Sequence, residues 1–143
     1  MLIKKHQHFK MNFNKPLFTI ITPTLNNKIG LIKTINSVKA QKLTNFEFIV
    51  VDGGSTDGTI EILNESKIIT KWISENDKGI YDAINKGINF SNGKYINTIN
   101  SGDTYFSENS LSIIKDYFDK NDVSFVFGAV KKKKFTTNIN QKK

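Results

Sequence analysis

The chain has 143 residues, of which 21 are basic and 13 acidic, so its formal net charge is +8. This length fits one domain with one hydrophobic core, and 38% hydrophobic against 24% charged residues is a globular composition. The absence of cysteine excludes disulfides and thiolate metal sites. No apolar run reaches the roughly 18 residues of a membrane span, and no secretory h-region is present, so we expect a cytoplasmic protein.

The positive charge lies at the two ends of the sequence. Residues 1–15 contain four lysines and residues 131–143 contain six, with no acidic residue in either stretch. The stretch 16–130 holds 11 lysines and all 13 acidic residues, so it is slightly acidic. The chain has no arginine, the residue that most often forms specific hydrogen bonds with guanine bases. We therefore expect no nucleic-acid partner, and we expect a basic arm over 1–15, one domain over 16–130 and a Lys-rich polar tail over 131–143. The basic ends are either simply solvated or in peripheral contact with an anionic membrane surface.

Short apolar runs alternate with amphipathic stretches along the folded part. Strands are predicted, in chain order, at 18–22, 46–51, 68–74, 94–99 and 123–130, and Pro23 is expected to end the first of them. Helices are predicted between them at 29–40, 59–65, 79–91 and 108–119. In the third helix the apolar face is expected to consist of Tyr81, Ile84 and Ile88. This alternation predicts an α/β fold with a mostly parallel sheet and helices on both faces.

Polar clusters follow four of the predicted strands, at 22–26, 52–57, 74–78 and 100–103. Because ligands of such sheets bind beyond the carboxyl ends of the strands, we expect these clusters to form one site. The glycine-rich turn of a dinucleotide fold is missing after the first strand, and the P-loop-like spacing that begins at Gly53 has Thr59 in place of the lysine. The two histidines lie in the N-terminal arm, so no Ser-His-Asp triad is expected.

The ordered set of motifs resembles family 2 glycosyltransferases of the GT-A fold, of the branch that builds bacterial capsule, O-antigen or exopolysaccharide. The resemblance covers residues 17 to about 128 and is carried by Thr22–Asn26, Val50–Thr59, Ser74–Ile88, Gly93–Ile96 and Asn100–Asp103. It implies a nucleotide-diphosphate sugar as donor, with a UDP-sugar first among the candidates, and a saccharide or lipid-linked acceptor. It also implies that Mn²⁺ or Mg²⁺ neutralises the diphosphate leaving group, because these cations favour carboxylate and phosphate oxygen.

The resemblance also implies roles for individual residues. Asp103 matches the last aspartate of the family's DxD-type motif and is expected to hold the metal. Asp52 matches the first aspartate of the pair after the second strand, near the base and ribose. The loop that runs along the nucleotide is matched by Thr22, Pro23, Thr24 and Asn26.

Two further residues of the nucleotide-sugar site lie in the third cluster. Lys78 is placed where a cation meets the phosphates, as a flexible point charge. Asp82 either reaches the sugar or stabilises the start of its helix. From the residues alone, Asp57 is expected to cap a helix rather than to bind a ligand. Trp72 is expected in the core.

Departures from the family's pattern concern the acidic residues and the length. Gly53 stands where the family often has a second aspartate, and Gly102 where its metal motif often has another carboxylate. In the family, an acidic residue of the second half deprotonates the acceptor, yet only 40 residues follow Asp103. We therefore expect a C-terminally truncated GT-A domain, the donor-binding half, without a general base.

Two functions stay open. The first is an inverting glycosyltransferase of polysaccharide synthesis. The second is a truncated, non-catalytic nucleotide-binding module, or a partner subunit of a split enzyme. A general base contributes ~10²–10⁴ in rate and acceptor positioning ~7–11 kcal/mol, so a donor half alone should bind nucleotide but transfer sugar very slowly. The acidic residues beyond Asp103 match no base motif, so the catalytic residue is unassigned; they are Glu108, Asp116, Asp119 and Asp122.

Overall fold

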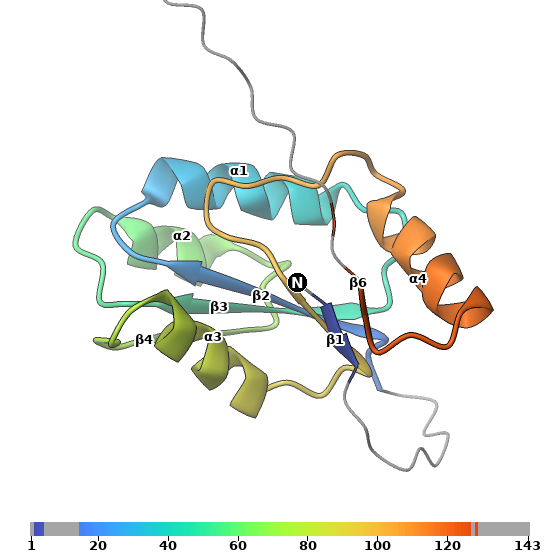
Figure 1. The fold of residues 1–143 in the computed structure, drawn as a ribbon. Coiled ribbons are helices and arrows are strands. Elements are labelled where there is room, and N and C mark those ends of the chain that lie inside the picture. Colours follow the sequence, from blue (N-terminus) through green and yellow to red (C-terminus); the bar gives the residue numbers. More distant parts are fainter. Residues whose placement is uncertain (1, 5–14, 127, 129–143) are drawn as a thin grey trace, which may run out of the picture.

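The computed structural model describes residues 2–4, 15–126 and 128 (Figure 1). The strands of this part are β1 (Leu2–Lys4), β2 (Phe18–Thr24), β3 (Phe46–Asp52), β4 (Lys71–Ser74), β5 (Tyr95–Thr98) and β6 (Phe125–Val126). Its helices are α1 (Lys28–Lys39), α2 (Thr59–Glu65), α3 (Ile80–Asn89) and α4 (Ser110–Lys120). The expected alternation of strands and helices is confirmed over these residues.

The strands form one sheet in the order β4-β3-β2-β5-β1-β6. The first four of these strands run parallel to one another, so the expected mostly parallel α/β sheet is confirmed. β1 is antiparallel to both β5 and β6, and it lies within the region that the sequence analysis described only as a basic arm. Three residues carry too little periodicity for a strand prediction. The last predicted strand is described only as β6, and the predicted tail lies outside the described residues.

Pro23 does not end the first strand, because β2 continues to Thr24. The carbonyl of Pro23 accepts a hydrogen bond from the Ser101 N–H at 3.3 Å, so the nitrogen of Pro23 also faces the β5 side. On that side the ladder ends at the pair Ile21 and Thr98. No residue of β5 pairs with β2 at the level of Pro23, so the N–H that proline lacks is not needed for a hydrogen bond between these two strands.

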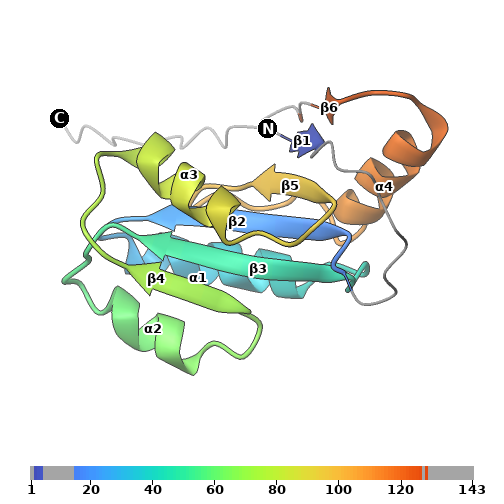
Figure 2. The same ribbon diagram turned by 90° about the horizontal axis from the view of Figure 1, so that it is seen from below.

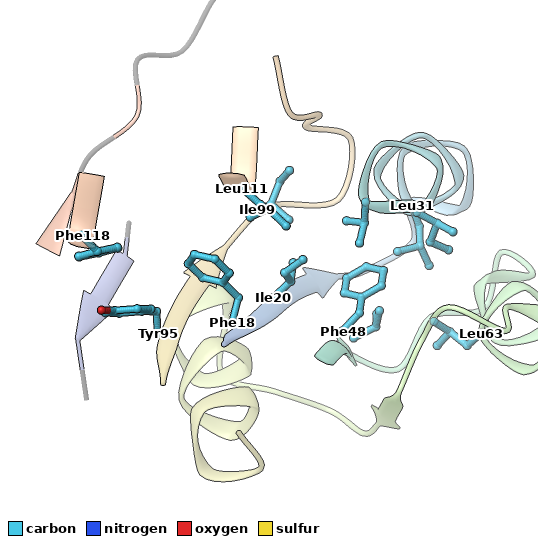
Figure 3. Close-up of a cluster of buried hydrophobic side chains, with 12 residues drawn as sticks. Phe18, Ile20, Leu31, Phe48, Leu63, Tyr95, Ile99, Leu111 and Phe118 are labelled. Carbon is cyan, nitrogen blue, oxygen red and sulfur yellow. The ribbon is translucent and has the colours of Figure 1, made fainter. Parts of the chain in front are cut away.

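The main core lies on the face of the sheet that α1, α2 and α4 cover, whereas α3 covers the opposite face (Figures 1 and 2). Alternate residues of the central strands enter this core, among them Phe18, Ile20 and Phe48 (Figure 3). Tyr95 stacks on Phe118 of α4 with 4.2 Å between ring centroids. Each fully buried side chain of this kind contributes ~1.5–3 kcal/mol, so this face holds most of the stability. The predicted core residue Trp72 is half-buried at its margin, and its prediction is therefore only partly right.

The buried face of α3 differs from the predicted one. The residues buried there are Ala83 and Gly87, whereas Tyr81 is 78% exposed. The helix lies so close to the sheet that a Cβ on Gly87 would stand 2.6 Å from the Ile21 Cγ2 atom. Small residues spaced four apart allow this approach, and the apolar pattern alone did not reveal it.

We expect Gly87→Ala to destabilise the protein by about 1 kcal/mol. Overpacking against Ile21 costs ~1–3 kcal/mol, and the better helix propensity of alanine recovers at most ~1 kcal/mol. Urea unfolding measures the change. Asn85→Ala, at an exposed position of the same helix, should be neutral or stabilising. A stabilised Gly87→Ala protein would show that α3 does not pack this closely.

Candidate functional site

The loops that follow β2, β3, β4 and β5 meet at the carboxyl edge of the parallel strands. The Gly53 N–H donates to the Thr24 carbonyl at 2.9 Å, and the Glu75 N–H donates to the Asp52 carbonyl at 3.0 Å. The Ser101 N–H reaches back to the carbonyl of Pro23, which joins the fourth loop to the first. The four predicted polar clusters therefore lie side by side on one edge, which we call the rim.

Asn26 connects the first two loops. Its side-chain Oδ1 accepts from the Thr56 N–H at 2.9 Å, and its own N–H donates to the Ser55 Oγ at 2.7 Å. Asn26 adopts the left-handed conformation, with φ of 46°, which asparagine tolerates better than most residues. The side chain thus has a structural partner, and its contact with a nucleotide stays a prediction.

Asp52 organises the second loop from inside. Its side chain is 0% exposed, and its Oδ2 accepts from the Ser55 N–H at 2.9 Å and from the Ser74 hydroxyl at 2.7 Å. Oδ2 also accepts from the Gly54 N–H, and Oδ1 accepts from the Ser55 hydroxyl. A carboxylate this well paired sets the shape of the loop, while a direct contact with base or ribose stays a prediction.

Asp57 lies between the starts of two helices. Its Oδ2 accepts from the Lys28 N–H at 2.8 Å in α1, and its Oδ1 accepts from the Thr59 N–H at 3.1 Å in α2. The Thr59 hydroxyl, followed by the Lys28 N–H, lowers the pKa of Asp57 from 3.8. The carboxylate thus satisfies helix N-terminal donors, which agrees with the expected capping role, although Gly58 occupies the N-cap position itself.

Thr22 and Thr24 are buried in β2 on the same face of the sheet as Phe18 and Ile20. Their hydroxyl oxygens have no hydrogen-bond partner in the described part of the chain. Leaving such a group unpaired costs ~1–3 kcal/mol, so each of these hydroxyls needs a partner such as a water molecule or a ligand. Their predicted position along a nucleotide is compatible with this placement but is not tested by it.

Asp103 combines a fixed backbone with a free carboxylate. The Thr34 hydroxyl lies 2.8 Å from the Asp103 carbonyl and 3.0 Å from the N–H of Gly102. The Asn27 amide donates to the Ser101 carbonyl at 3.0 Å, which holds the same loop against the start of α1. The Asp103 carboxylate is exposed and makes no hydrogen bond or ion pair with the described residues.

Asp82 and Lys78 lie at the start of α3. The Asp82 Oδ2 accepts from the Lys78 N–H at 3.1 Å and pairs with the Lys86 Nζ at 3.3 Å. The Lys78 N–H is the largest cause that lowers the pKa of Asp82 from 3.8. These contacts fit the helix-stabilising role left open for Asp82, while its contact with the sugar stays a prediction. The Lys78 ammonium is exposed and pairs with no carboxylate among residues 15–126.

Asp77 is a rim residue that the sequence patterns did not single out. Its Oδ1 accepts from the Gly79 N–H at 2.8 Å, and its Oδ2 lies only 2.7 Å from where a Cβ on Gly53 would stand. A carboxylate of the third loop therefore fills the place that a side chain at position 53 would take. The only signal in the sequence was a glycine after the second strand together with an aspartate in the next loop.

The rim contains no ready-made metal centre within the described ranges, since no three His, Cys, Asp or Glu side chains gather there. The free carboxylate of Asp103 suits a divalent cation whose other ligands would be phosphate oxygens and water molecules, as is common for Mg²⁺. A surface hollow of about 290 Å³ lies elsewhere, on α4, and includes none of the predicted site residues; it is lined by Ile113, Asp116, Tyr117, Lys120 and Asn121. None of the described helices is long and apolar enough to cross a membrane.

Known proteins resemble this chain in sequence. The sequence model described as "Glycosyl transferase family 2" matches residues 19–143. A "PGL/p-HBAD biosynthesis glycosyltransferase" of Mycobacterium bovis is 32% identical over 123 residues, which is 80% of this chain and 47% of that protein. The "Putative teichuronic acid biosynthesis glycosyltransferase TuaG" of Bacillus subtilis is 35% identical over 95 residues, 64% of this chain and 38% of that one. The chain thus spans about half the length, or less, of these curated relatives.

Solved structures resemble it in fold. S. aureus TarS 1–349 in complex with UDP-GlcNAc has a TM-score of 0.65 and 26% identity over 72% of this chain and 31% of that one. The mannosyltransferase PcManGT from Pyrobaculum calidifontis, in complex with GDP-Man and Mn²⁺, has a TM-score of 0.61 and 21% identity over 68% of this chain and 31% of that one. The second similarity concerns the fold alone.

Proposed function

The chain belongs to glycosyltransferase family 2 and has the GT-A fold, and from this premise we propose that its rim binds a nucleotide-diphosphate sugar for transfer to an acceptor. The observation that carries the proposal is the junction of four polar loops beside a carboxylate, Asp103, that no described residue neutralises. A UDP-sugar is the first candidate, because the neighbour TarS is described with UDP-GlcNAc.

Each loop has a role in this proposal. The first loop lies along the nucleoside through the backbone around Thr24 and Asn26, with the unpaired hydroxyls of Thr22 and Thr24 beneath it. Asp52 keeps the second loop in shape. The Lys78 ammonium meets the phosphates as a mobile point charge. Asp103 would hold Mn²⁺ or Mg²⁺, which would supply charge neutralisation to the departing diphosphate.

The acceptor and the stereochemical outcome of the sugar transfer belong to the same proposal. The relatives' names refer to PGL/p-HBAD and teichuronic acid biosynthesis, which supports a lipid-linked or saccharide acceptor in cell-surface glycan synthesis. Inversion follows from the resemblance and needs a general base, a role that we assign to no described residue. The second candidate is a nucleotide-binding subunit that works with a partner, and it is favoured by the absence of an assigned general base among the described residues.

Calorimetric titration with UDP, GDP and CDP, with and without Mn²⁺, tests the binding claim. We expect UDP to bind, and to bind more tightly with Mn²⁺, because Asp103 would hold the cation and the cation would offset the negative charge of the diphosphate. If none of the three nucleotides binds, the proposed function is wrong. A transfer assay with radiolabelled UDP-sugar then separates the candidates, since rapid turnover by this chain alone would exclude the non-catalytic subunit.

A further inference from the structure

Lys86 joins α3 to the loop between β4 and α3. Its ammonium lies 2.9 Å from the Glu75 Oε1, 3.1 Å from the Asn76 carbonyl oxygen and 3.3 Å from the Asp82 Oδ2. The Lys86 side chain is 21% exposed, which is less than half the exposure of Glu75. The Glu75 carboxylate is the first cause that raises the pKa of Lys86 from 10.5. One cation is thus shared by three oxygens, two of them in the loop.

The loop that Lys86 holds lies against the second loop of the rim. The Asn76 Oδ1 lies 2.6 Å from the position that a Cβ on Gly54 would take. The Asp77 Oδ2 lies 2.7 Å from the position that a Cβ on Gly53 would take. Gly54 has φ of 90°, a conformation that favours glycine. The side chains of Asn76 and Asp77 therefore occupy the space that Cβ atoms at positions 54 and 53 would take.

Lys115 offers a comparison within the same chain. It pairs with Asp119 at 2.6 Å and with Asp116 at 4.0 Å, and all three residues lie on α4. Such exposed pairs within one helix contribute little and position no other segment. Lys86 has two of its three acceptors outside its own helix, so its charge links the β4–α3 loop to α3.

We propose that Lys86 is a positioning residue of the nucleotide site, which holds the β4–α3 loop on Gly53 and Gly54 so that the Asp77 carboxylate is preset at the rim. This inference rests on the proposed function. Lys86 acts through the loop and makes no contact with the ligand itself. Groups that are already ordered in the free protein bind a ligand more tightly, because less conformational entropy is lost on binding.

The test measures UDP affinity in the presence of Mn²⁺ for three variants. Lys86→Met keeps the aliphatic stem and removes the charge, and we expect UDP to bind roughly tenfold more weakly. Lys86→Arg keeps the charge and should restore affinity to within about twofold of the original protein. Lys115→Met loses comparable ion pairs on α4 and should leave UDP affinity unchanged.

A double-mutant cycle separates positioning from general destabilisation. Gly53→Ala places a Cβ against the Asp77 carboxylate and displaces it, without a positive φ at this position. If Lys86 acts through this contact, Lys86→Met should have little further effect on UDP affinity in the Gly53→Ala protein. Additive effects, or unchanged UDP affinity in Lys86→Met, would overturn the proposal.

The two proposals fail in distinguishable ways. An original protein that binds no nucleotide refutes the proposed function, and this inference with it. If the original protein and the Lys86→Met protein bind UDP equally well, only the positioning role is refuted. Should Lys86→Met not fold, Glu75→Gln weakens the same contact from an exposed position and should lower UDP affinity by a smaller factor.

Discussion

Replacing Asp103 with asparagine should abolish the Mn²⁺ dependence of UDP binding. The loop backbone at Asp103 is held by the Thr34 hydroxyl and not by the carboxylate, so the loop should keep its place. Asparagine has nearly the same shape but no negative charge for a cation. Interactions with charged groups contribute ~1.5–3 kcal/mol, so UDP should bind about 10–100-fold more weakly with Mn²⁺. Without the metal, its affinity should be unchanged.

Calorimetry with UDP, in Mn²⁺ and in chelator, measures this effect. Asp116→Asn is the control, because it removes the same charge from an exposed position on α4. Equal losses in both variants would point to long-range charge rather than to a metal ligand. A Mn²⁺ dependence that survives in Asp103→Asn would remove Asp103 from the proposed metal site.

Glu47→Ala should lower the free energy of unfolding by about 3 kcal/mol, among the larger effects of single substitutions. The Glu47 Oε1 accepts from the Thr19 hydroxyl, from the Asn92 N–H and from the Gly93 N–H. Glu47 is 7% exposed, so its removal leaves the buried Thr19 hydroxyl without this acceptor, and the Gly93 N–H keeps only the Thr19 Oγ1 at 2.9 Å. Gly93 could not move to compensate, since its Cα is so close to β2 that a Cβ there would stand 2.5 Å from the Thr19 nitrogen.

Urea unfolding measures this loss. Glu47→Gln keeps one acceptor oxygen and should lose less, and Glu61→Ala, at an exposed position of α2, should change little. Glu47 lies near the start of β3 and the rim begins at its end, so UDP affinity of the folded Glu47→Ala protein should be retained. A loss no larger than that of Glu61→Ala would show that the buried network does not hold the sheet together.

Local patterns predicted most of the elements because they depend on residues close in sequence. Helices α1 and α2 are recognisable from apolar spacing and turn-forming residues, and β3 from a continuous apolar run. The errors arose where a distant neighbour decides. Proline is tolerated in β2 because β5 stops short of it, and α3 lies close to the sheet because its small residues face the strands. β1 exists through pairing with β5, far along the chain.

The amino-acid sequence by itself determined the order of strands and helices, and with it the edge on which the polar clusters gather, because parallel strands all end on the same side. Only the tertiary structure decided which polar groups are already paired. Asp52 and Asp82 are bound by neighbouring N–H groups, Asp103 is free, and Asp77 fills the space left by Gly53. A carboxylate has the same formula in each place, and what it does depends on the donors and charges that folding brings within about 3 Å.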